Sequence, residues 1–387
     1  MINLVKDTID KKDIHSLIEW LRSSPHLTKG NLTNELEKQW AEWIGSKYSI
    51  YVNSGSSANL AILYALKLMN RIKNNKVVVP AVSWVTTVAP IMQFGMTPLL
   101  CEADKHNLGI DPSAFESLCK IEKPDALMLV HVLGVPASME DIIFLCRKYN
   151  VILIEDSCES VGSSYKGKKT GTFGVAGSFS FYYSHVISTI EGGMISTDDR
   201  DLCNVIKSIR AHGWSRDLDS DIKQDLKKMY KVDDFKDLYT FYFPGFNLRA
   251  SDLQAFIGLQ QMKKIDSFCE KRYKNLLLYD KLINNDYWKL DLSRKDCFIS
   301  NLAYPIITPK IKSLVSNLKD HGIETRPLVC GSIGKQPFWY NKFGKVSFNF
   351  ADKVDDYGLY IPNNHELTES HIEYISDIVN FSLNNEK

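Results

Sequence analysis

The 387-residue sequence has no excess of either charge and no long apolar run. Its 47 lysines and arginines nearly balance its 46 aspartates and glutamates, which leaves a net charge of +1. Because nucleic acids bind clustered basic surfaces, this balance argues against a nucleic-acid partner. No apolar stretch approaches the roughly 20 residues that span a bilayer, so no membrane partner is expected. Residues 1–7 lack the pattern of a targeting signal, and a cytoplasmic location is expected.

Closely spaced cysteines are also lacking. The eight cysteines are dispersed, and no two lie within ten residues of each other. Compact zinc or iron–sulfur motifs place their ligands only a few residues apart, so we predict no metal site. Dispersed thiols in a long chain of this kind are most simply kept reduced. The sequence also shows no internal repeat and no low-complexity segment.

The sequence does contain a regular alternation of short apolar strands and helices, preceded by two helices at 12–23 and 33–44. This alternation predicts a mostly parallel sheet with helices on both faces. Ligands of such sheets bind beyond the carboxyl ends of the strands. The expected strands are 48–53, 77–80, 98–101, 126–132 and 151–155, and the expected helices between them are 56–69, 86–94, 112–121 and 139–149.

The pattern changes after this alternation. Two further strands, 177–182 and 193–196, flank an irregular loop. Residues 214–243 are charged and aromatic with weak periodicity, which indicates either a lid on the substrate side or a solvated connector. We expect two domains, 1–275 and 276–387, the second a small α+β unit. The remaining expected elements are helices at 200–211, 250–278, 311–321 and 370–383 and strands at 301–306 and 322–326.

Three features lie where a ligand of such a sheet would bind. Gly55-Ser56-Ser57 follows the first strand and opens a helix, whose free N–H groups attract phosphate, although a serine there can equally be an ordinary helix cap. Trp84 follows the next strand, where it could stack on a planar cofactor or be an ordinary buried tryptophan. Asp156 and the preceding Glu155 end an aliphatic strand, and a carboxylate there needs a cationic or donor partner.

The chain as a whole, over about residues 10–380, resembles the DegT/DnrJ/EryC1/StrS sugar aminotransferase family of pyridoxal 5'-phosphate (PLP) proteins. The resemblance implies an α/β type I PLP fold, with a mostly parallel sheet in the large domain, and a homodimer with shared active sites. The matching motifs, in order, are Gly55-Ser56-Ser57-Ala58, Pro80 to Thr87, Glu155-Asp156, Lys169 to Gly174, Arg210-Ala211-His212-Gly213, Gly245 to Arg249 and Gly322 to Leu328.

The resemblance also implies a set of residues around the cofactor. Asp156 would pair with the pyridine nitrogen, which keeps the ring protonated, and Trp84 would stack on the ring. Ser56, Ser57 and Ser180 would hold the phosphate, while Asn247 would reach in from the second subunit. Three residues are candidates for the substrate side, His212, Arg249 and Arg326, although each arginine could equally form a structural ion pair. The cofactor set is Ser56, Ser57, Trp84, Asp156, Glu159, Ser180 and Asn247.

The chain departs from the family pattern in one loop, where Tyr182-Tyr183 also replace the family His-Pro. The usual family loop reads Ser-Phe-His-Pro-x-Lys-x-x-x-Thr-Gly-Glu-Gly-Gly, and its lysine forms the covalent link to PLP and moves the proton. Aligned through Phe181 and Glu191, that lysine position is occupied by His185, and Ile190 replaces a glycine. An imidazole forms no lasting link with PLP, but it can move a proton near neutral pH.

A histidine at this position is typical of the PLP-dependent sugar 3-dehydratases within the family. The subset implies that L-glutamate converts PLP to pyridoxamine 5'-phosphate (PMP). It also implies that the C3 hydroxyl then leaves a nucleotide-linked 4-keto-6-deoxy hexose, most specifically GDP-4-keto-6-deoxy-D-mannose of the colitose route, with release of ammonia. The other histidine-bearing subset carries an iron–sulfur cluster on closely spaced cysteines, which this chain lacks.

Two other functions stay open from the sequence. One is an ordinary nucleotide-sugar aminotransferase that uses a different lysine, with Lys166, Lys168 and Lys169 as candidates. The other is a catalytically inactive PLP-binding regulator. The group that moves the proton must lie at the cofactor C4′ atom, which argues against an aminotransferase that uses a different lysine. The lack of a DNA-binding module argues against a regulator.

Overall fold

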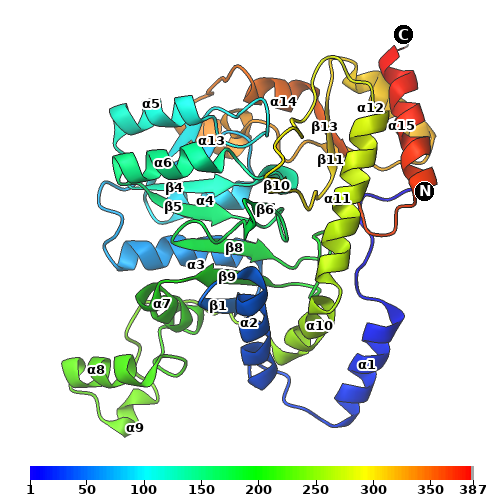
Figure 1. Ribbon diagram of the computed structural model, residues 1–387. Helices are drawn as coiled ribbons and strands as arrows, with labels where there is room; N and C mark the ends of the chain where they lie inside the picture. Colours follow the sequence, from blue (N-terminus) through cyan, green and yellow to red (C-terminus); the bar gives the residue numbers. More distant parts are fainter. Residues whose placement is uncertain (385–387) are drawn as a thin grey trace.

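The computed structural model describes residues 1–384 and is built around a seven-stranded sheet (Figure 1). Strands β1 and β8 both pair antiparallel with β9, and all other neighbours are parallel. Six strands therefore point the same way and only β9 is reversed, which confirms the mostly parallel sheet. In sheet order the strands are β1 (Tyr48–Val52), β9 (Gly193–Thr197), β8 (Ala176–Ser180), β5 (Ile152–Asp156), β4 (Ala126–Val130), β2 (Lys76–Pro80) and β3 (Thr97–Cys101).

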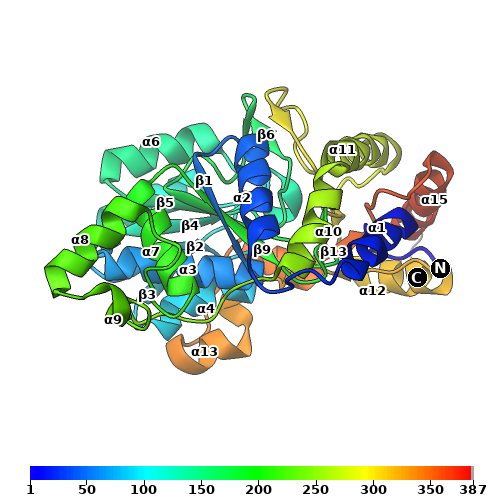
Figure 2. The same ribbon diagram turned by 90° about the horizontal axis from the view of Figure 1, so that it is seen from below.

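Helices cover both faces of this sheet (Figure 2). Successive side chains on a strand point to opposite faces, so Val77 and Val79 of β2 belong to one core cluster while Val78 belongs to the other. The first cluster packs under α3 (Gly55–Leu68), α4 (Val85–Gln93) and α7 (Arg200–Arg210). The opposite face is covered by α2 (Asn31–Ile44), α5 (Pro112–Glu122) and α6 (Met139–Tyr149).

The segment 214–243 forms two helices, α8 (Ser220–Tyr230) and α9 (Asp234–Asp237), that project from the body (Figure 1). Arg200, at the start of α7, forms ion pairs with Asp219 and Asp221 at the start of α8. Since α7 follows the end of the reversed strand β9, this attachment lies at the amino edge of the parallel strands. The helix α8 therefore does not lie over the carboxyl edge of its own chain, where a lid would be needed.

The helix expected at 250–278 is two helices, α10 (Asp252–Met262) and α11 (Ile265–Leu282), so the prediction of one continuous helix was wrong. The break falls at Lys263 and Lys264. The ammonium of Lys264 is held by Asp10 at 2.8 Å and Asp13 at 2.6 Å, which joins the break to α1 (Lys11–Arg22). The expected domain boundary at 275/276 falls inside α11 and stays a prediction.

The C-terminal part forms a second, three-stranded sheet in the order β11-β13-β12. The central strand β13 was not predicted from the sequence. The N-terminal segment joins this part, because Ile2 forms a bridge with Ile323. The elements are β11 (Tyr304–Ile307), α12 (Ile311–Asp320), β12 (Arg326–Pro327), η2 (Ile333–Lys335), α13 (Pro337–Phe343), α14 (Ala351–Tyr357), β13 (Gly358–Ile361) and α15 (Glu369–Asn384).

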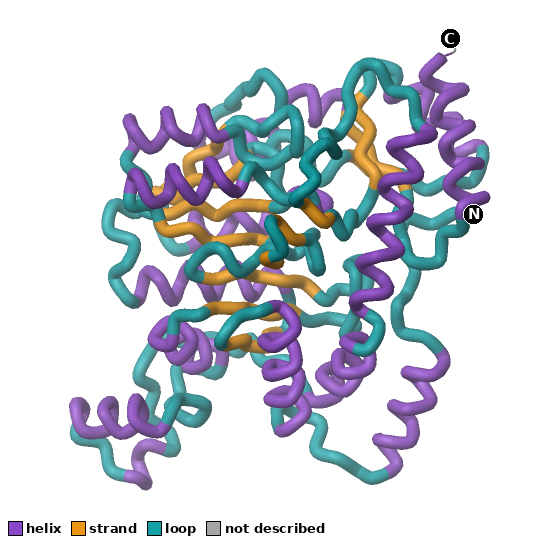
Figure 3. Tube along the Cα trace, viewed as in Figure 1, coloured by secondary structure: helices purple, strands orange, loops and turns teal. Residues whose placement is uncertain are grey.

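Short elements complete the fold, whose helices, strands and loops are distinguished in Figure 3. A small sheet joins β6 (Ser164–Tyr165) to β7 (Lys168–Lys169) and β10 (Cys297–Phe298), and the single turn η1 (Val132–Gly134) follows β4. Within residues 1–384, none of the helices combines the length and apolar content that crossing a membrane requires.

Two tryptophans are expected to differ sharply in their effect on stability. Trp40 of α2 is fully buried, packs edge-on against Phe179 and Phe181, and donates to Ser196 Oγ at 3.1 Å, whereas Trp84 is 52% exposed. Trp40→Ala should lower the free energy of unfolding by about 3–5 kcal/mol. Trp84→Ala, as the matched control, should change it by less than about 1 kcal/mol. Urea titration measures both, and equal losses would contradict this assignment of core and surface.

Candidate active site

The Asp156 carboxylate lies at the carboxyl end of β5 and is 5% exposed. Its Oδ2 accepts hydrogen bonds from Asn59 Nδ2 of α3 and Thr87 Oγ1 of α4, both at 2.7 Å. Its Oδ1 accepts only a longer bond from the Cys158 backbone N–H, at 3.2 Å. The amide of Asn59 is fixed in turn, because its oxygen accepts from Ser178 Oγ. The carboxylate is thus held in one orientation, with Oδ1 the less occupied oxygen.

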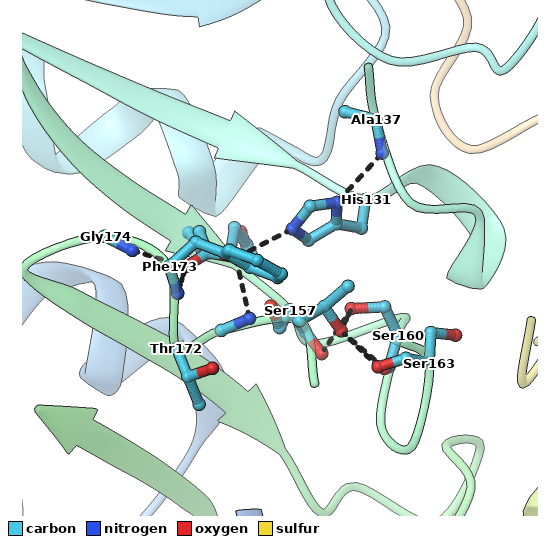
Figure 4. A network of polar contacts seen from close by, with 12 residues as sticks. His131, Ala137, Ser157, Ser160, Ser163, Thr172, Phe173 and Gly174 are labelled. Carbon is cyan, nitrogen blue, oxygen red and sulfur yellow. Dashed lines mark hydrogen bonds and ion pairs between the residues drawn. The ribbon is translucent and has the colours of Figure 1, made fainter. Parts of the chain in front are cut away.

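The neighbouring Glu155 has a structural role. Its side chain is fully buried and accepts hydrogen bonds from His131 Nε2 at 3.0 Å and from the backbone N–H groups of Gly171, Phe173 and Gly174 at 2.6–2.8 Å. Figure 4 shows His131 and the 172–174 segment in this network. All of these donors belong to the protein, so Glu155 serves to fix the loop after β7 and leaves Asp156 as the acid available to a ligand.

The start of α3 forms a cradle suited to phosphate. Ser54 is the N-cap and accepts from the Ser57 N–H at 3.0 Å, while the exposed Ser56 donates to Thr86 Oγ1 at 3.0 Å. A Cβ at Gly55 would lie 2.7 Å from Ser180 Cβ, so the glycine is what allows Ser180 to approach the helix end. The three predicted serines are therefore brought together at a helix N-terminus, where partial positive charge favours an anion.

Trp84 occupies the N-cap position of α4, three residues before Thr87, which contacts Asp156. Its indole is 52% exposed, although the strand that precedes it is almost wholly buried. This excludes the alternative of an ordinary buried tryptophan. This exposed aromatic face, on the helix that also supplies a donor to Asp156, is available for stacking.

Glu159 lies three residues after Asp156, in the same loop. Its Oε2 accepts from the Leu133 N–H at 2.6 Å, in the turn η1. Burial, together with the negative charge of Asp156, raises the pKa of Glu159 to about 7, although the backbone donor acts in the opposite direction. A carboxyl with this pKa exchanges its proton near neutrality. Burial raises the pKa values of Cys330 and of Tyr360 in β13, and the nearby charge of Glu159 raises both further.

The loop that carries His185 connects β8 to β9 and is pinned at its base. The Phe181 N–H donates to Gly192 O and the Thr189 N–H donates to Phe181 O, both at 2.9 Å. Tyr51 donates its hydroxyl to Thr189 Oγ1 at 2.8 Å. Because the bond between Thr189 and Phe181 closes the loop on itself, residues 182–188 are held on a fixed base.

His185 lies at the change from exposed to buried residues within this loop. Tyr182 and Tyr183 before it are each 40% exposed, whereas Val186 and Ile187 after it are buried. The imidazole Nδ1 is buried and has no hydrogen-bond partner among residues 1–384. Burial, and secondly the positive charge of Arg272, lowers the pKa of His185 to about 4. The ring is therefore a neutral imidazole at physiological pH.

Ile190, at the position of the family glycine, has a backbone φ of +71° and is 52% exposed. This left-handed conformation is unfavourable for a β-branched residue. It persists because the neighbouring backbone is fixed: the Ile190 N–H donates to Ser188 Oγ at 3.0 Å and Gln254 Nε2 donates to Glu191 O at 2.6 Å.

The predicted substrate-side residues fall into two places. Arg249 donates to Asn247 Oδ1 at 3.0 Å and lies 3.3 Å from His212 Nε2, and both Asn247 and Arg249 line a cavity of about 680 Å³. Asn247 thus lies with the substrate candidates and makes no hydrogen bond to the serine cradle among the described residues. Arg326 stands apart on β12, pairs with Glu324 at 3.2 Å, and lies near Tyr183 and Tyr360.

These residues fit the cofactor that the resemblance implies. The serine cradle suits a phosphate, Trp84 offers a ring face, and Asp156 presents one lightly occupied carboxylate oxygen for a protonated ring nitrogen. The candidate lysines of the alternative hypothesis are engaged elsewhere. Lys166 pairs with Glu140 at 2.8 Å and Lys169 donates to Trp43 O at 2.8 Å, while Lys168 lies over the Phe173 ring.

The sequence reasoning missed the residues that hold Asp156. Asn59 and Thr87 lie one turn into α3 and at the start of α4, within motifs that were recognised for other reasons. A polar side chain on the inner face of an otherwise apolar helix was the available signal for Asn59, which is 1% exposed.

The pKa of Glu159 makes a testable contribution to the pH dependence of stability. Its folded-state value of about 7 lies above the ordinary 4.5, so the folded chain binds the extra proton between these values. The stabilisation is full below pH 4.5 and is lost as the pH rises through 7. Relative to the native chain, cofactor-free Glu159→Gln should gain about 2 kcal/mol in unfolding free energy between pH 5 and pH 8. Urea titrations at both pH values measure this, and parallel pH profiles for the two chains would contradict it.

Comparison with known proteins agrees with this geometry. The model of the DegT/DnrJ/EryC1/StrS aminotransferase family matches residues 7–380. A GDP-4-keto-6-deoxy-D-mannose 3-dehydratase from Yersinia pseudotuberculosis is 34% identical over 98% of each chain. One of the same name from Escherichia coli O55:H7 is 34% identical over 96% of this chain and 97% of its own.

Among solved structures, a GDP-4-keto-6-deoxymannose-3-dehydratase with a trapped PLP-glutamate geminal diamine has a TM-score of 0.89 and 31% identity, over 98% of this chain and 100% of its own. The match extends over the large sheet, the C-terminal sheet and the loop between β8 and β9. The chain therefore belongs to the DegT/DnrJ/EryC1/StrS aminotransferase family and has its α/β, aminotransferase-like fold.

Proposed function

We propose that this chain is a PLP/PMP-dependent 3-dehydratase that acts on GDP-4-keto-6-deoxy-D-mannose, with L-glutamate as the amino donor. The observation that carries the proposal is His185, a neutral imidazole at the position where aminotransferases of the family have their lysine. The net reaction transfers one oxygen atom. The sugar loses the oxygen of its C3 hydroxyl, and glutamate gains one oxygen as it becomes 2-oxoglutarate and releases ammonia. Relatives that are 34% identical over nearly the whole chain have names that support this substrate.

The cofactor, when bound, supplies a ring that accepts electrons from the carbon being deprotonated. The chain's own residues hold and orient it. Asp156, fixed by Asn59 and Thr87, keeps the pyridine nitrogen protonated, and Trp84 stacks on the ring. Ser56, Ser57 and Ser180 bind the phosphate at the start of α3, and Glu159 lies beside the ring. Without a lysine link, these contacts alone retain the cofactor.

His185 moves the proton in the proposed mechanism. Being neutral, it accepts the proton from the cofactor C4′ atom, and the resulting imidazolium can pass that proton to the departing C3 hydroxyl as water forms. The same imidazole therefore acts first as the base at C4′ and then as the acid at the C3 hydroxyl. Because no lysine amine stands at this position, the group that in aminotransferases of the family directs the reaction toward an aminated sugar is replaced by an imidazole.

The rest of the active site is proposed to involve a second copy of the chain. Asn247 would reach the phosphate of the other subunit, and His212 and Arg249 beside it would face the same substrate. Arg326 suits contact with the diphosphate, because a guanidinium binds phosphate oxygens in pairs. We further propose a division into domains 1–275 and 276–387 and a cytoplasmic location.

Product mass is expected to settle the reaction class. Incubation with PLP, L-glutamate and GDP-4-keto-6-deoxy-D-mannose should give a sugar nucleotide that lacks one oxygen atom, together with free ammonia. An aminotransferase would give a sugar nucleotide with an amino group in place of the ketone oxygen. Mass spectrometry separates the two, and the aminated product, or no product despite cofactor binding, would overturn the proposal.

The variant His185→Asn keeps a polar side chain of similar size but cannot take up a proton. We expect kcat to fall by at least about 10²-fold, as for the loss of a general base, while PLP absorbance and PLP affinity stay close to native. Glu116→Gln, which replaces a half-buried carboxylate of α5 that pairs with Lys148, is the control and should leave kcat unchanged. Retained turnover in His185→Asn would remove the imidazole from the mechanism.

Borohydride reduction tests the alternative aminotransferase that uses another lysine. With PLP bound, the native chain should yield no covalent pyridoxyl-lysine, because Lys166 and Lys169 are engaged with Glu140 and Trp43. Peptide mass mapping after reduction provides the measurement. A stoichiometric pyridoxyl group on any of Lys166, Lys168 or Lys169 would favour the alternative.

A further inference from the structure

The Tyr51 side chain joins the edge of the large sheet to the loop that carries His185. Tyr51 lies on β1, an edge strand, and is fully buried. Its hydroxyl donates to Thr189 Oγ1 at 2.8 Å, and Thr189 Oγ1 donates in turn to Glu191 O at 2.9 Å. Thr189 is also fully buried, so bulk water does not replace either partner. The bond therefore connects two segments that are 138 residues apart in the chain.

The backbone of Tyr51 is itself held in place by an ion pair. Strand β1 pairs with β9 on one side. On the other side the Tyr51 N–H donates to Glu37 Oε1 and the Tyr51 carbonyl accepts from Arg210 Nη1, both at 2.8 Å. Glu37 and Arg210 are paired with each other at 2.5 Å, and Arg210 also binds Asp217 at 3.1 Å. The phenol thus extends from a backbone that is fixed on both sides.

The end of the loop that Tyr51 contacts lacks strand pairing of its own. Strand β9 begins only at Gly193, and Ile190, between Thr189 and this strand, has a left-handed φ of +71°. The Thr189 N–H donates to Phe181 O at 2.9 Å and so closes residues 182–188. Of the two hydrogen bonds made by the Thr189 hydroxyl, only the one from Tyr51 reaches outside the loop. Tyr51 therefore ties Thr189 to the large sheet.

The loop also packs closely on this hydrogen bond. A Cβ at Gly192 would lie 2.2 Å from Thr189 Oγ1 and 2.7 Å from the Tyr51 hydroxyl oxygen, which is closer than such atoms approach. Val186 and Ile187, the two residues that follow His185, belong to the same buried core cluster as Tyr51. The phenol therefore supports the half of the loop between His185 and β9 through packing as well as through its hydroxyl.

We propose that Tyr51 is a positioning residue for His185, whose hydroxyl fixes the loop end at Thr189 and so keeps the imidazole in place for proton transfer. The proposal rests on the proposed function, in which His185 takes the proton from C4′. Proton transfer requires hydrogen-bond reach, and a displacement of about 1 Å can lower a rate about 100-fold. Release of one loop end would widen the range of imidazole positions, while the serines and Asp156 still hold the cofactor.

Packing alone is the competing account, because the Tyr51 ring also contacts Phe181, with ring centroids 6.1 Å apart. Tyr51→Phe separates the two accounts, since it keeps the ring and removes only the hydroxyl oxygen. Tyr279→Phe in α11 is the matched control. Tyr279 is equally buried, and its hydroxyl donates to Pro362 O at 2.8 Å in the C-terminal part. Each variant removes one buried donor, but only Tyr51→Phe removes it from the loop of His185.

Hydrogen exchange of the cofactor-free chain, followed by mass spectrometry, tests whether the hydroxyl holds the loop. In Tyr51→Phe, peptides that cover residues 182–190 should exchange about fivefold faster than in the native chain, the effect of losing one hydrogen bond. Thr189→Val should have the same effect. Thr189→Ser, which keeps a hydroxyl, and Tyr279→Phe should leave these peptides at the native rate. Native exchange in Tyr51→Phe, or equally fast exchange in Tyr279→Phe, would overturn the inference.

The kinetics of the loaded enzyme supply the second readout. Tyr51→Phe and Thr189→Val should each lower kcat about tenfold, with KM for the sugar nucleotide and PLP affinity within about twofold of native. Thr189→Ser and Tyr279→Phe should keep the native kcat. The double variant that combines Tyr51→Phe with Thr189→Val should lose no more than either single variant, because both remove the same bond.

A native kcat in Tyr51→Phe, or the same loss of kcat in Tyr279→Phe, would refute the positioning role. Because hydrogen exchange needs neither cofactor nor turnover, its result stands even if the proposed dehydratase activity is not found.

Discussion

The orientation of the Asp156 carboxylate is the constraint on which the rest of the site depends. A nearly buried carboxylate needs donors, and here they come from the first turns of two helices, through Asn59 of α3 and Thr87 of α4. Both helices follow parallel strands and therefore begin at the same edge of the sheet. The same two helix starts supply the serine cradle and Trp84. One edge of one sheet thus fixes an acid, an anion-binding helix end and an aromatic face together.

The alternation of strands and helices was sufficient to predict the sheet, its helical layers and the edge where the candidate site lies. Position within a strand also explains why only one of two adjacent acids faces the site. Glu155 shares the parity of Leu153 and faces the α5–α6 side, whereas Asp156 shares the parity of Ile154 and faces α3 and α4. The sequence alone could not show this, because it did not reveal which helices covered which face. The assignment of Asp156 came from family resemblance.

Other features depend on contacts between distant segments, which the sequence pattern does not encode. The break between α10 and α11 coincides with Lys264 binding Asp10 and Asp13 about 250 residues earlier in the chain. Residues 358–361 form the strand β13 because they pair with β11 on one side and β12 on the other. The burial of Arg272 in α11 likewise depends on distant segments, because its guanidinium binds the carbonyls of Leu302 and Asn363. His185, by contrast, was proposed by aligning one continuous loop with the family pattern, which needs no contact between distant segments.

The continuity of α11 has a mechanical consequence. Its 18 residues form a rod of about 27 Å. Ile265 and Cys269 near one end belong to the same core cluster as Val186 and Ile187 of the β8–β9 loop, and the rod also packs against α15 of the C-terminal part. A rod cannot turn at one end and stay still at the other. A displacement of the C-terminal sheet would therefore be transmitted through α11 to the β8–β9 loop that carries His185. Separation of the C-terminal part from the large sheet and a change in the geometry of the candidate active site would then occur together.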